Sequence, residues 1–470
     1  MNAAACPTGA SPLATAVPAS RLARIGLALR RHGRTIRMIQ WAVVFVYLAL
    51  LLIPAALPLP PEDARLFGHL GTIAQFVFWG IWWPFVLISM VLFGRVWCGV
   101  FCPEGALAEQ ASRVGLGRGI PRWLRWQGWP FVAFVLTTVY GQLVSVYQYP
   151  LAAALVLGGS TVAAIAIGLL YGRNKRVWCR HLCPVSGVFS LLARLAPVHY
   201  RSDPERWTAK AGGPVQPVNC APLLDIRRLH GAAQCHACGR CAGQRGAVEL
   251  TARAPSEEIV RHGAQDATRW DLRLVLYGLC GVAMGAFHWT ASPWFIDAKQ
   301  AVAMWLLDHG GERLLDTDAP WWLLTHQPER HDVFSWLDGL MIIAYIGATG
   351  LVVGAVLHLL CAIGARLLAP RPAPTAHLSL AFVPLAGAGV FLGLSALTVS
   401  LLRGDGFALY WVGPLRELLL AAAALWTLRL GWGISGRYGA GLHRRLGATL
   451  LVAAGAGFVV WGWALLFWLW

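Results

Sequence analysis

Four cysteines in two copies of one short phrase are the residues whose types and spacing point most clearly to chemistry. The first copy reads Arg95-Val96-Trp97-Cys98-x-x-x-Cys102-Pro103, and the second reads Arg176-Val177-Trp178-Cys179-x-x-x-Cys183-Pro184. Each copy follows a long apolar run, so we expect all four thiols on the same side of a membrane. Soft thiolates in this number are typical ligands of an iron–sulfur cluster or of zinc.

The spacing within each copy favours a shared ligand. Cys98 and Cys102 are four residues apart, so on a helical turn both side chains point the same way. A proline directly after a ligand cysteine is common in ferredoxin runs. Buried thiolates need a cation, and a reducing cytoplasm disfavours disulfides. We therefore predict one [4Fe–4S] cluster on Cys98, Cys102, Cys179 and Cys183, with zinc or copper binding and plain packing as the alternatives.

A third cysteine group predicts a second [4Fe–4S] centre. Its spacing, Cys235-x-x-Cys238-x-x-Cys241, matches the first three ligands of a bacterial ferredoxin run, but the usual fourth Cys-Pro is absent. Cys220, fifteen residues upstream, is the natural fourth ligand. Weaker candidates are His230, His236 and the cysteines of the repeated phrases, and a three-cysteine zinc site is the main rival.

The remaining cysteines and the nearby arginines carry weaker signals. Arg240 and Arg245 would offset the negative charge of the second centre and raise its reduction potential, although both suit a solvated surface equally well. Cys280 and Cys361 lie in apolar runs, where single thiols mostly act as small hydrophobic groups. Cys6 has no expected role.

The composition indicates that membrane helices position these cysteines. Of the 470 residues 57% are hydrophobic and 13% are charged, about half the charged fraction of a soluble domain. The apolar residues gather in stretches of membrane length. We predict an all-α integral membrane protein with about nine transmembrane helices, at 38–57, 73–93, 129–148, 151–171, 272–290, 336–360, 378–402, 413–428 and 447–470.

The distribution of charge sets the expected topology. With the N-terminus in the cytoplasm, the inner segments carry 32 Lys and Arg residues, and the outer segments carry 5 together with 10 Asp and Glu residues. This asymmetry follows the positive-inside rule, and it supports a cytoplasmic N-terminus. It also accounts for the net charge of +17 without a nucleic-acid partner. The resemblance described below implies the inner membrane of a bacterium.

Four regions follow from this topology. We expect a disordered, basic cytoplasmic tail at 1–37 and a four-helix membrane core of two hairpins at 38–184. A cytoplasmic ferredoxin-like segment at 185–271 and a five-helix membrane region at 272–470, with an acidic outer loop at 291–335, complete the chain. Trp97 and Trp178 are expected at the level of the lipid headgroups, where indole rings prefer to lie.

Several histidines offer further alternatives. Those of the outer side could form a metal site or a proton exit for quinol oxidation, or could simply line a wet loop. They are His288, His309, His326 and His331, together with Glu329 and Asp332. Near the inner side, His358 and His377 could ligate haem b as a pair, although no supporting pattern surrounds them.

At its cysteine phrases the chain resembles the membrane-bound polyferredoxins, a family that includes NapH-type, NosR-type and CcoG-type proteins. The resemblance rests on Cys98, Cys102, Pro103, Cys179, Cys183 and Pro184, on the hairpins that carry them, and on Cys235, Cys238 and Cys241 downstream. It covers about residues 38–245, and the five C-terminal spans lie outside it. The resemblance implies an electron-transfer protein with its centres on the cytoplasmic side, linked to the quinol pool or to the reduction of a partner's cofactor.

These observations predict a membrane-bound iron–sulfur protein that passes electrons between the quinone pool or a cytoplasmic donor and a redox protein partner. As an enzyme it would be the electron-transfer or quinol-dehydrogenase subunit of an oxidoreductase. One alternative is an assembly factor that reduces copper for a respiratory enzyme, with the loop 291–335 as the only candidate receiving site. The other is a zinc-stabilised membrane scaffold. Membrane lipid is the one partner common to all three.

Overall fold

A computed structural model describes residues 20–61, 64–208, 218–369 and 374–470 of the chain. Within these ranges the protein is mostly helical with very little strand, and eight helices are long and apolar enough to cross a membrane. A ninth apolar helix, Trp129–Leu143, has 15 residues and spans about 22 Å, which is less than the hydrocarbon core of a bilayer. The chain is therefore an all-α, multi-pass membrane protein.

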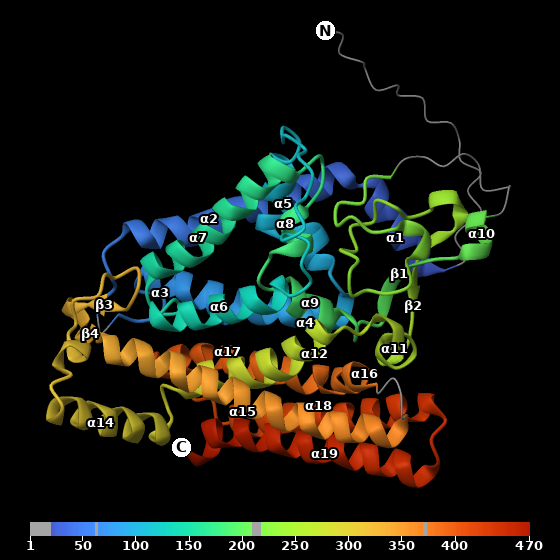
Figure 1. Ribbon diagram of the computed structural model, residues 1–470. Coiled ribbons are helices and arrows are strands. Elements are labelled where there is room, and N and C mark those ends of the chain that lie inside the picture. Colours follow the sequence, from blue (N-terminus) through green and yellow to red (C-terminus); the bar gives the residue numbers. More distant parts are fainter. Residues whose placement is uncertain (1–19, 62–63, 209–217, 370–373) are drawn as a thin grey trace.

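The N-terminal half holds four of the predicted spans (Figure 1). The second of them is continuous although its middle turns are π-helical. Three of these elements are long enough to span, namely α2 (Gly33–Ala56), α3–η1–α4 (Leu70–Gln75, Phe76–Trp82 and Trp83–Phe93) and α7 (Pro150–Tyr171), and the fourth is the shorter helix α6 (Trp129–Leu143). The short elements that carry or follow the repeated phrases are η2 (Trp97–Phe101), α5 (Pro103–Ala111), α8 (Val177–His181) and α9 (Ser186–Ala193).

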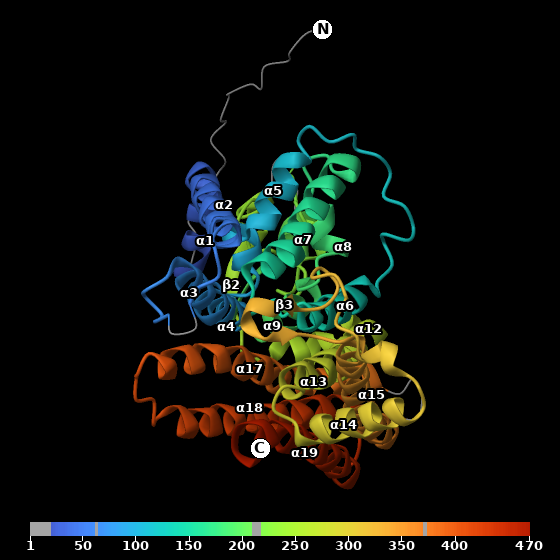
Figure 2. The same cartoon turned by 90° about the vertical axis from the view of Figure 1, so that its left-hand side faces the viewer.

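The C-terminal half packs beneath these helices as a second layer (Figure 2). One hydrophobic core joins the halves, because Met90 of α4 and Leu191 and Leu192 of α9 are buried in the same cluster as residues of the last spans. The spans are α12–η7–α13 (Arg269–Arg273, Leu274–Val282 and Ala283–His288), α15 (Trp336–Leu368), α16–η10–α17 (Thr375–Ser379, Leu380–Phe382 and Val383–Gly404), α18–η11 (Val412–Ser435 and Gly436–Tyr438) and α19–η12 (Leu442–Ala464 and Leu465–Leu469).

The segments between the spans gather at two opposite ends of the molecule (Figure 1). One end carries α1 (Arg21–Arg31), α10 (Pro204–Thr208), α11 (Gly263–Asp266) and the antiparallel strands β1 (Val198–Ser202) and β2 (Val248–Ala252), with Tyr200 opposite Leu250. The other end carries α14 (Pro293–Asp308) and the short strands β3 (His326–Gln327) and β4 (Asp332–Val333). Short one-turn helices lie in these segments: η4 (Ile226–Arg228), η5 (Gln244–Gly246), η6 (Glu258–His262), η8 (Glu312–Leu315) and η9 (Pro328–Arg330).

Two predictions about these elements need correction. The tail predicted as disordered over 1–37 is helical from Arg21 onward, and residues 1–19 lie outside the described part of the chain. Ser20 caps α1 by accepting a hydrogen bond from the Ala23 amide, and α1 packs against β2. The span predicted at 129–148 ends at Leu143, because the chain turns at Ser145, whose φ is +50°.

Candidate iron–sulfur site

Each repeated phrase folds into a turn that is one residue wider than an α-helical turn. The amide of Cys102 donates to the carbonyl of Trp97 at 2.8 Å, and the amide of Cys183 donates to the carbonyl of Trp178 at 3.0 Å. The sequence predicted an ordinary helical turn, and both copies instead close a π-type turn, a feature frequent at functional sites. The shared hydrogen bond supports the prediction that the two hairpins are related by an internal repeat.

Cys102 is the N-cap residue of α5. Its backbone is extended, Pro103 occupies the first helical position, and the Cys102 Sγ accepts a hydrogen bond from the Gly105 amide at 3.4 Å. A sulfur at the N-terminus of a helix lies where the helix dipole favours negative charge. The proline after the ligand cysteine is thus explained by the helix that follows it.

The structure brings the four cysteines of the repeated phrases together. Burial raises the pKa of the Cys102 thiol well above its usual value, and the charges of Cys179 and Cys98 raise it further. Burial likewise raises the pKa of Cys183, with additional contributions from Glu104 and from the other three cysteines. Thiols that repel one another in this way share one buried space, so a bound cation would be needed to hold them as thiolates.

The second group gathers in the same manner, and Cys220 belongs to it. Burial raises the pKa of Cys241, and the charges of Cys235, Cys238 and Cys220 raise it further. His230 takes no part, because its ring nitrogens bond Asp266 at 2.8 Å and the Arg228 carbonyl at 2.9 Å. The Cys220 thiol therefore lies near the three cysteines, whereas both ring nitrogens of His230 are held by other partners.

The two groups touch through their backbones at Gly99. The nitrogen and Cα of Cys238 lie 3.0 and 3.1 Å from the position of a Cβ on Gly99, and the His236 carbonyl lies closer still. The Gly99 carbonyl accepts a hydrogen bond from Gln40 of α2 at 2.9 Å. The glycine between the first two cysteines therefore permits a contact that no other residue would allow.

The arginine of each phrase forms its hydrogen bonds with the other hairpin. The sequence analysis did not predict these contacts. Arg176, from the second phrase, donates to the Cys98 carbonyl of the first. Arg95, from the first phrase, donates to the Ser186 hydroxyl at 2.9 Å, and this hydroxyl donates to the Cys179 carbonyl at 2.8 Å. The recurrence of arginine at the same position of both phrases was the available signal.

Acidic residues complete this network. Glu109 of α5 accepts from Arg176 at 2.8 Å and from Arg240 at 2.6 Å. Burial opposes ionisation of this carboxyl, but the two guanidinium groups hold its pKa below the usual value. Glu258 accepts from the amides of Ala232 and Ala233 at 2.7 and 3.2 Å, which fixes the loop that leads into Cys235.

Trp97 and Trp178 are buried in the protein, and their depth relative to the lipid headgroups stays a prediction. Their exposed fractions are 8% and 7%. The Trp97 ring packs edge-on against Trp82 at 5.2 Å, and the Trp178 indole donates to the Glu104 carboxylate at 3.1 Å. The two rings therefore pack beside the cysteines of the first group.

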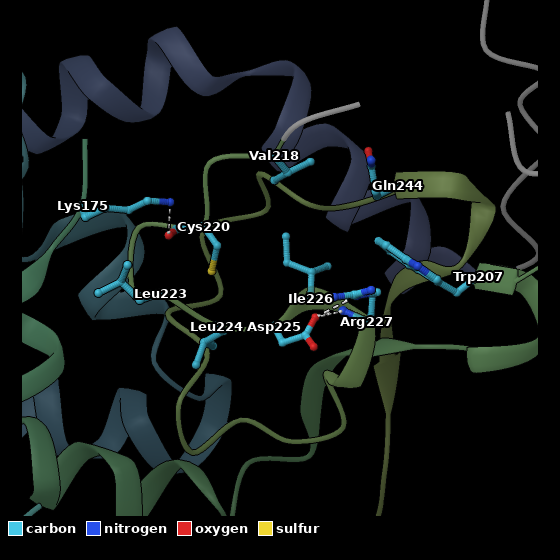
Figure 3. Close-up of a pocket in the computed structure, with 10 residues that line it drawn as sticks. All are labelled: Lys175, Trp207, Val218, Cys220, Leu223, Leu224, Asp225, Ile226, Arg227 and Gln244. Atoms are coloured by element: carbon cyan, nitrogen blue, oxygen red, sulfur yellow. Dashed lines mark hydrogen bonds and ion pairs between the residues drawn. The ribbon is translucent and has the colours of Figure 1, made fainter. Parts of the chain in front are cut away.

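A cavity of about 390 Å³ adjoins the second group at Cys220 (Figure 3). Lys175 donates to the Cys220 carbonyl at 3.2 Å on one side, and Trp207 and Arg227 lie on the other side. The wall consists of Lys175, Trp207, Val218, Cys220, Leu223, Leu224, Asp225, Ile226, Arg227 and Gln244. One candidate ligand, Cys220, therefore lies at the wall of a cavity.

The buried donors around the cysteines fit a cluster that carries sulfide. Among the described residues, Arg95 Nε, Arg176 Nη2 and His236 Nδ1 are buried nitrogens without a hydrogen-bond partner. Buried donors are normally satisfied, and a cluster's sulfides would accept from such groups. Within the described ranges, no group of three or more His, Cys, Asp or Glu residues could hold a single metal ion.

The histidine alternatives find little support in the described residues. His377 uses both ring nitrogens, at 2.7 Å from the Tyr438 hydroxyl and 2.7 Å from the Ile259 carbonyl, and His358 bonds Tyr277. His377 therefore has no ring nitrogen left for haem, while His358 has one ring nitrogen engaged. His288 is buried against Trp463 and Trp470. The described part of the outer loop likewise gathers no three-ligand site for copper.

Comparison with known proteins agrees with this geometry. Residues 75–123 and 155–201 match the family model of a 4Fe-4S binding domain. The match contains Cys98, Cys102, Cys179 and Cys183, and the second cysteine group lies outside it.

Three relatives share part of the chain. The regulatory protein NosR of Pseudomonas aeruginosa is 27% identical over 185 residues, which are 34% of this chain and 25% of NosR. The methylamine utilization ferredoxin-type protein MauN is 28% identical over 124 residues in Paracoccus denitrificans and 27% identical over 126 residues in Methylorubrum extorquens. Each match covers 24% of this chain, and the chain spans less than half of either MauN. No solved structure matches the chain.

Proposed function

We propose, from its membership in the membrane-associated ferredoxin-type 4Fe–4S family of the NosR and NapH type, that this chain binds two [4Fe–4S] clusters and passes single electrons between them. The observation that carries the proposal is the gathering of eight cysteines into two groups of four that touch at Gly99. Four cysteine ligands are what each such cluster requires.

The residues divide the work as follows. Cys98, Cys102, Cys179 and Cys183 would hold the first centre, and Cys220, Cys235, Cys238 and Cys241 would hold the second. The bound clusters supply one-electron redox chemistry. The unpartnered nitrogens of Arg95, Arg176 and His236 would donate hydrogen bonds to bound clusters, and the rings of Trp97 and Trp178 would exclude water from the first centre.

The two centres would connect to different partners. The cavity beside Cys220 supports entry or exit of electrons through a redox protein in the cytoplasm, which would meet Lys175 and Arg227 at its rim. The first centre adjoins α5, which packs against the membrane helices α2 and α7. This position favours exchange with the quinone pool on that side. The chain would then be the electron-transfer or quinol-dehydrogenase subunit of an oxidoreductase.

Localisation in a bacterial inner membrane, with the N-terminus in the cytoplasm, completes the proposal. Its support is the excess of Lys and Arg at the end of the molecule that carries α1, β1 and β2. Both cysteine groups then face the reducing compartment, where iron–sulfur ligands stay unpaired.

Anaerobic purification with metal analysis tests the function. We expect about eight iron and about eight acid-labile sulfide per chain, with a brown colour that bleaches on reduction. Cys183→Ser and Cys238→Ser should each remove one of two EPR signals of the reduced protein. Colourless protein that contains zinc and no sulfide would instead establish the zinc-stabilised scaffold.

A further inference from the structure

Glu109 joins the two cysteine groups through a pair of arginines. Its Oε2 accepts from Arg176, three residues before Cys179, at 2.8 Å. Its Oε1 accepts from Arg240, between Cys238 and Cys241, at 2.6 Å. The carboxylate side chain is 10% exposed and that of Arg176 is 1% exposed, so solvent screens this contact weakly.

Arg176 itself lies between the two groups. It donates to the Cys98 carbonyl, and its charge interacts with the thiolates of Cys179, Cys238 and Cys102. These cysteines come from both groups, so one guanidinium senses both. Because arginine keeps its charge in proteins, Arg176 is a fixed cation at the junction.

The charges of this bridge do not cancel. One carboxylate faces two guanidinium groups, which leaves one positive charge beside eight candidate thiolates. A buried charge acts over a longer range than an exposed one, and local charge sets the reduction potential of an iron–sulfur centre. A change in the bridge should therefore reach both centres.

We propose that Glu109, Arg176 and Arg240 form an electrostatic bridge that tunes the reduction potentials of the two centres together. The inference rests on the proposed function, because it requires two centres. When one electron moves, one centre loses it and the other gains it. No bond forms or breaks in this step, and the three bridging side chains keep their charges. They are positioning residues and carry no electron themselves.

Glu109→Gln in the full-length protein tests the bridge. The amide keeps the shape and one acceptor oxygen but removes the negative charge. Redox titration followed by EPR, under anaerobic conditions in detergent, should move both midpoint potentials to more positive values. The matched control is Glu249→Gln, which removes an exposed carboxylate from β2 of the same cytoplasmic segment. We expect this control to shift neither potential.

A second variant reverses the sign. Arg240→Gln removes a positive charge, so both midpoint potentials should move to more negative values. If Glu109→Gln does not assemble its clusters, the midpoint potentials of Arg240→Gln alone test the bridge. A shift of one centre only, or of neither, overturns the bridge. Wild-type protein without two reducible centres would refute the proposed function instead, so the two failures are distinguishable.

Discussion

At the scale of single residues, Gly99 is the contact on which the proximity of the two cysteine groups depends. A Cβ at this position would overlap the His236 carbonyl and press on the Cys238 backbone at 3.0 Å. We expect Gly99→Ala to cost about 1–3 kcal/mol, because two backbone segments must separate. EPR of the reduced protein should show a weaker or displaced signal from the second centre.

Gly119→Ala is the matched control for this change. Gly119 lies in the loop after α5, and nothing lies within 4 Å of a Cβ built there. The variant should keep both signals and its stability. If Gly99→Ala behaves like Gly119→Ala, the backbones of the two groups do not touch at this position.

His230 predicts a pH dependence of stability. The hydrogen bond to Asp266 raises the pKa of His230 to about 9, against the opposing effect of burial. The ordinary value of about 6.5 applies to the unfolded chain. The His230–Asp266 interaction therefore contributes fully to the free energy of unfolding below about pH 6.5, and this contribution is lost as the pH rises through about 9. Because His230 is half exposed, it should not exceed about 1 kcal/mol.

His230→Gln measures this contribution. Thermal unfolding in detergent should show a lower midpoint for the variant than for the wild type at pH 6. At pH 10 the two midpoints should coincide. An equal difference at both pH values would show that the charge of His230 contributes nothing.

At the scale of elements, α1 covers the second cysteine group. Leu29 packs against Gly239 and Leu27 packs against Gly243, while Arg30 donates to the Ala242 carbonyl at 2.7 Å. Leu29→Ala removes apolar cover worth about 1 kcal/mol and should admit solvent to the second centre. We expect the EPR signal of that centre to decay faster in air, while the first centre keeps its rate.

Ile25→Ala is the control on the same helix, because Ile25 is 52% exposed. It should leave both decay rates unchanged. Equal acceleration of both rates by Leu29→Ala would indicate general loosening rather than local cover.

Most elements were predictable from the sequence, and the exceptions have physical reasons. Apolar runs of membrane length predicted every span, because burying so many hydrophobic residues in lipid overrides local preference. The π-type turns at Cys102 and Cys183 were not predictable, because an i, i+4 pair looks the same in either helix. The structure of α1 was missed because its basic residues resemble those of a solvated tail, while its partners are on β2, more than 200 residues away.

At the scale of the whole molecule, we predict which of the two ends faces the cytoplasm. Tyr410, 89% exposed in the loop between α17 and α18, lies at the end expected outside, and Glu249 on β2 lies at the end expected inside. A membrane-impermeant thiol reagent should label Tyr410→Cys in intact cells. It should label Glu249→Cys only after lysis.

The unmodified protein is the control for this experiment. Its described cysteines lie in the two groups or inside the spans, so intact cells should show no labelling. Labelling of Glu249→Cys from outside would invert the topology and place both centres in the oxidising compartment.

The eight candidate ligands were predictable because thiols at short spacings carry their chemistry in the sequence. The residues that hold these ligands in place were not predictable from the sequence. Glu109, Ser186 and Glu258 bond Arg176, Arg95 and Ala232, which lie 67, 91 and 26 positions away in the chain. Such contacts exist only once the hairpins pack. The repeated arginines were visible from the start, but their exchange between the phrases could be seen only in three dimensions.

That exchange has a consequence for biogenesis. A nascent chain that has emerged only as far as α7 carries Cys98 and Cys102, but lacks the Arg176 that steadies Cys98. At the same stage Arg95 lacks its hydrogen-bond acceptor Ser186, which has not yet been translated. Under the proposed function, each hairpin supplies only two of the four ligands of the first centre, so we expect insertion of iron and sulfide to follow translation of both. A fragment truncated before Arg176 should therefore stay empty in any cell, however abundant its cluster-assembly machinery.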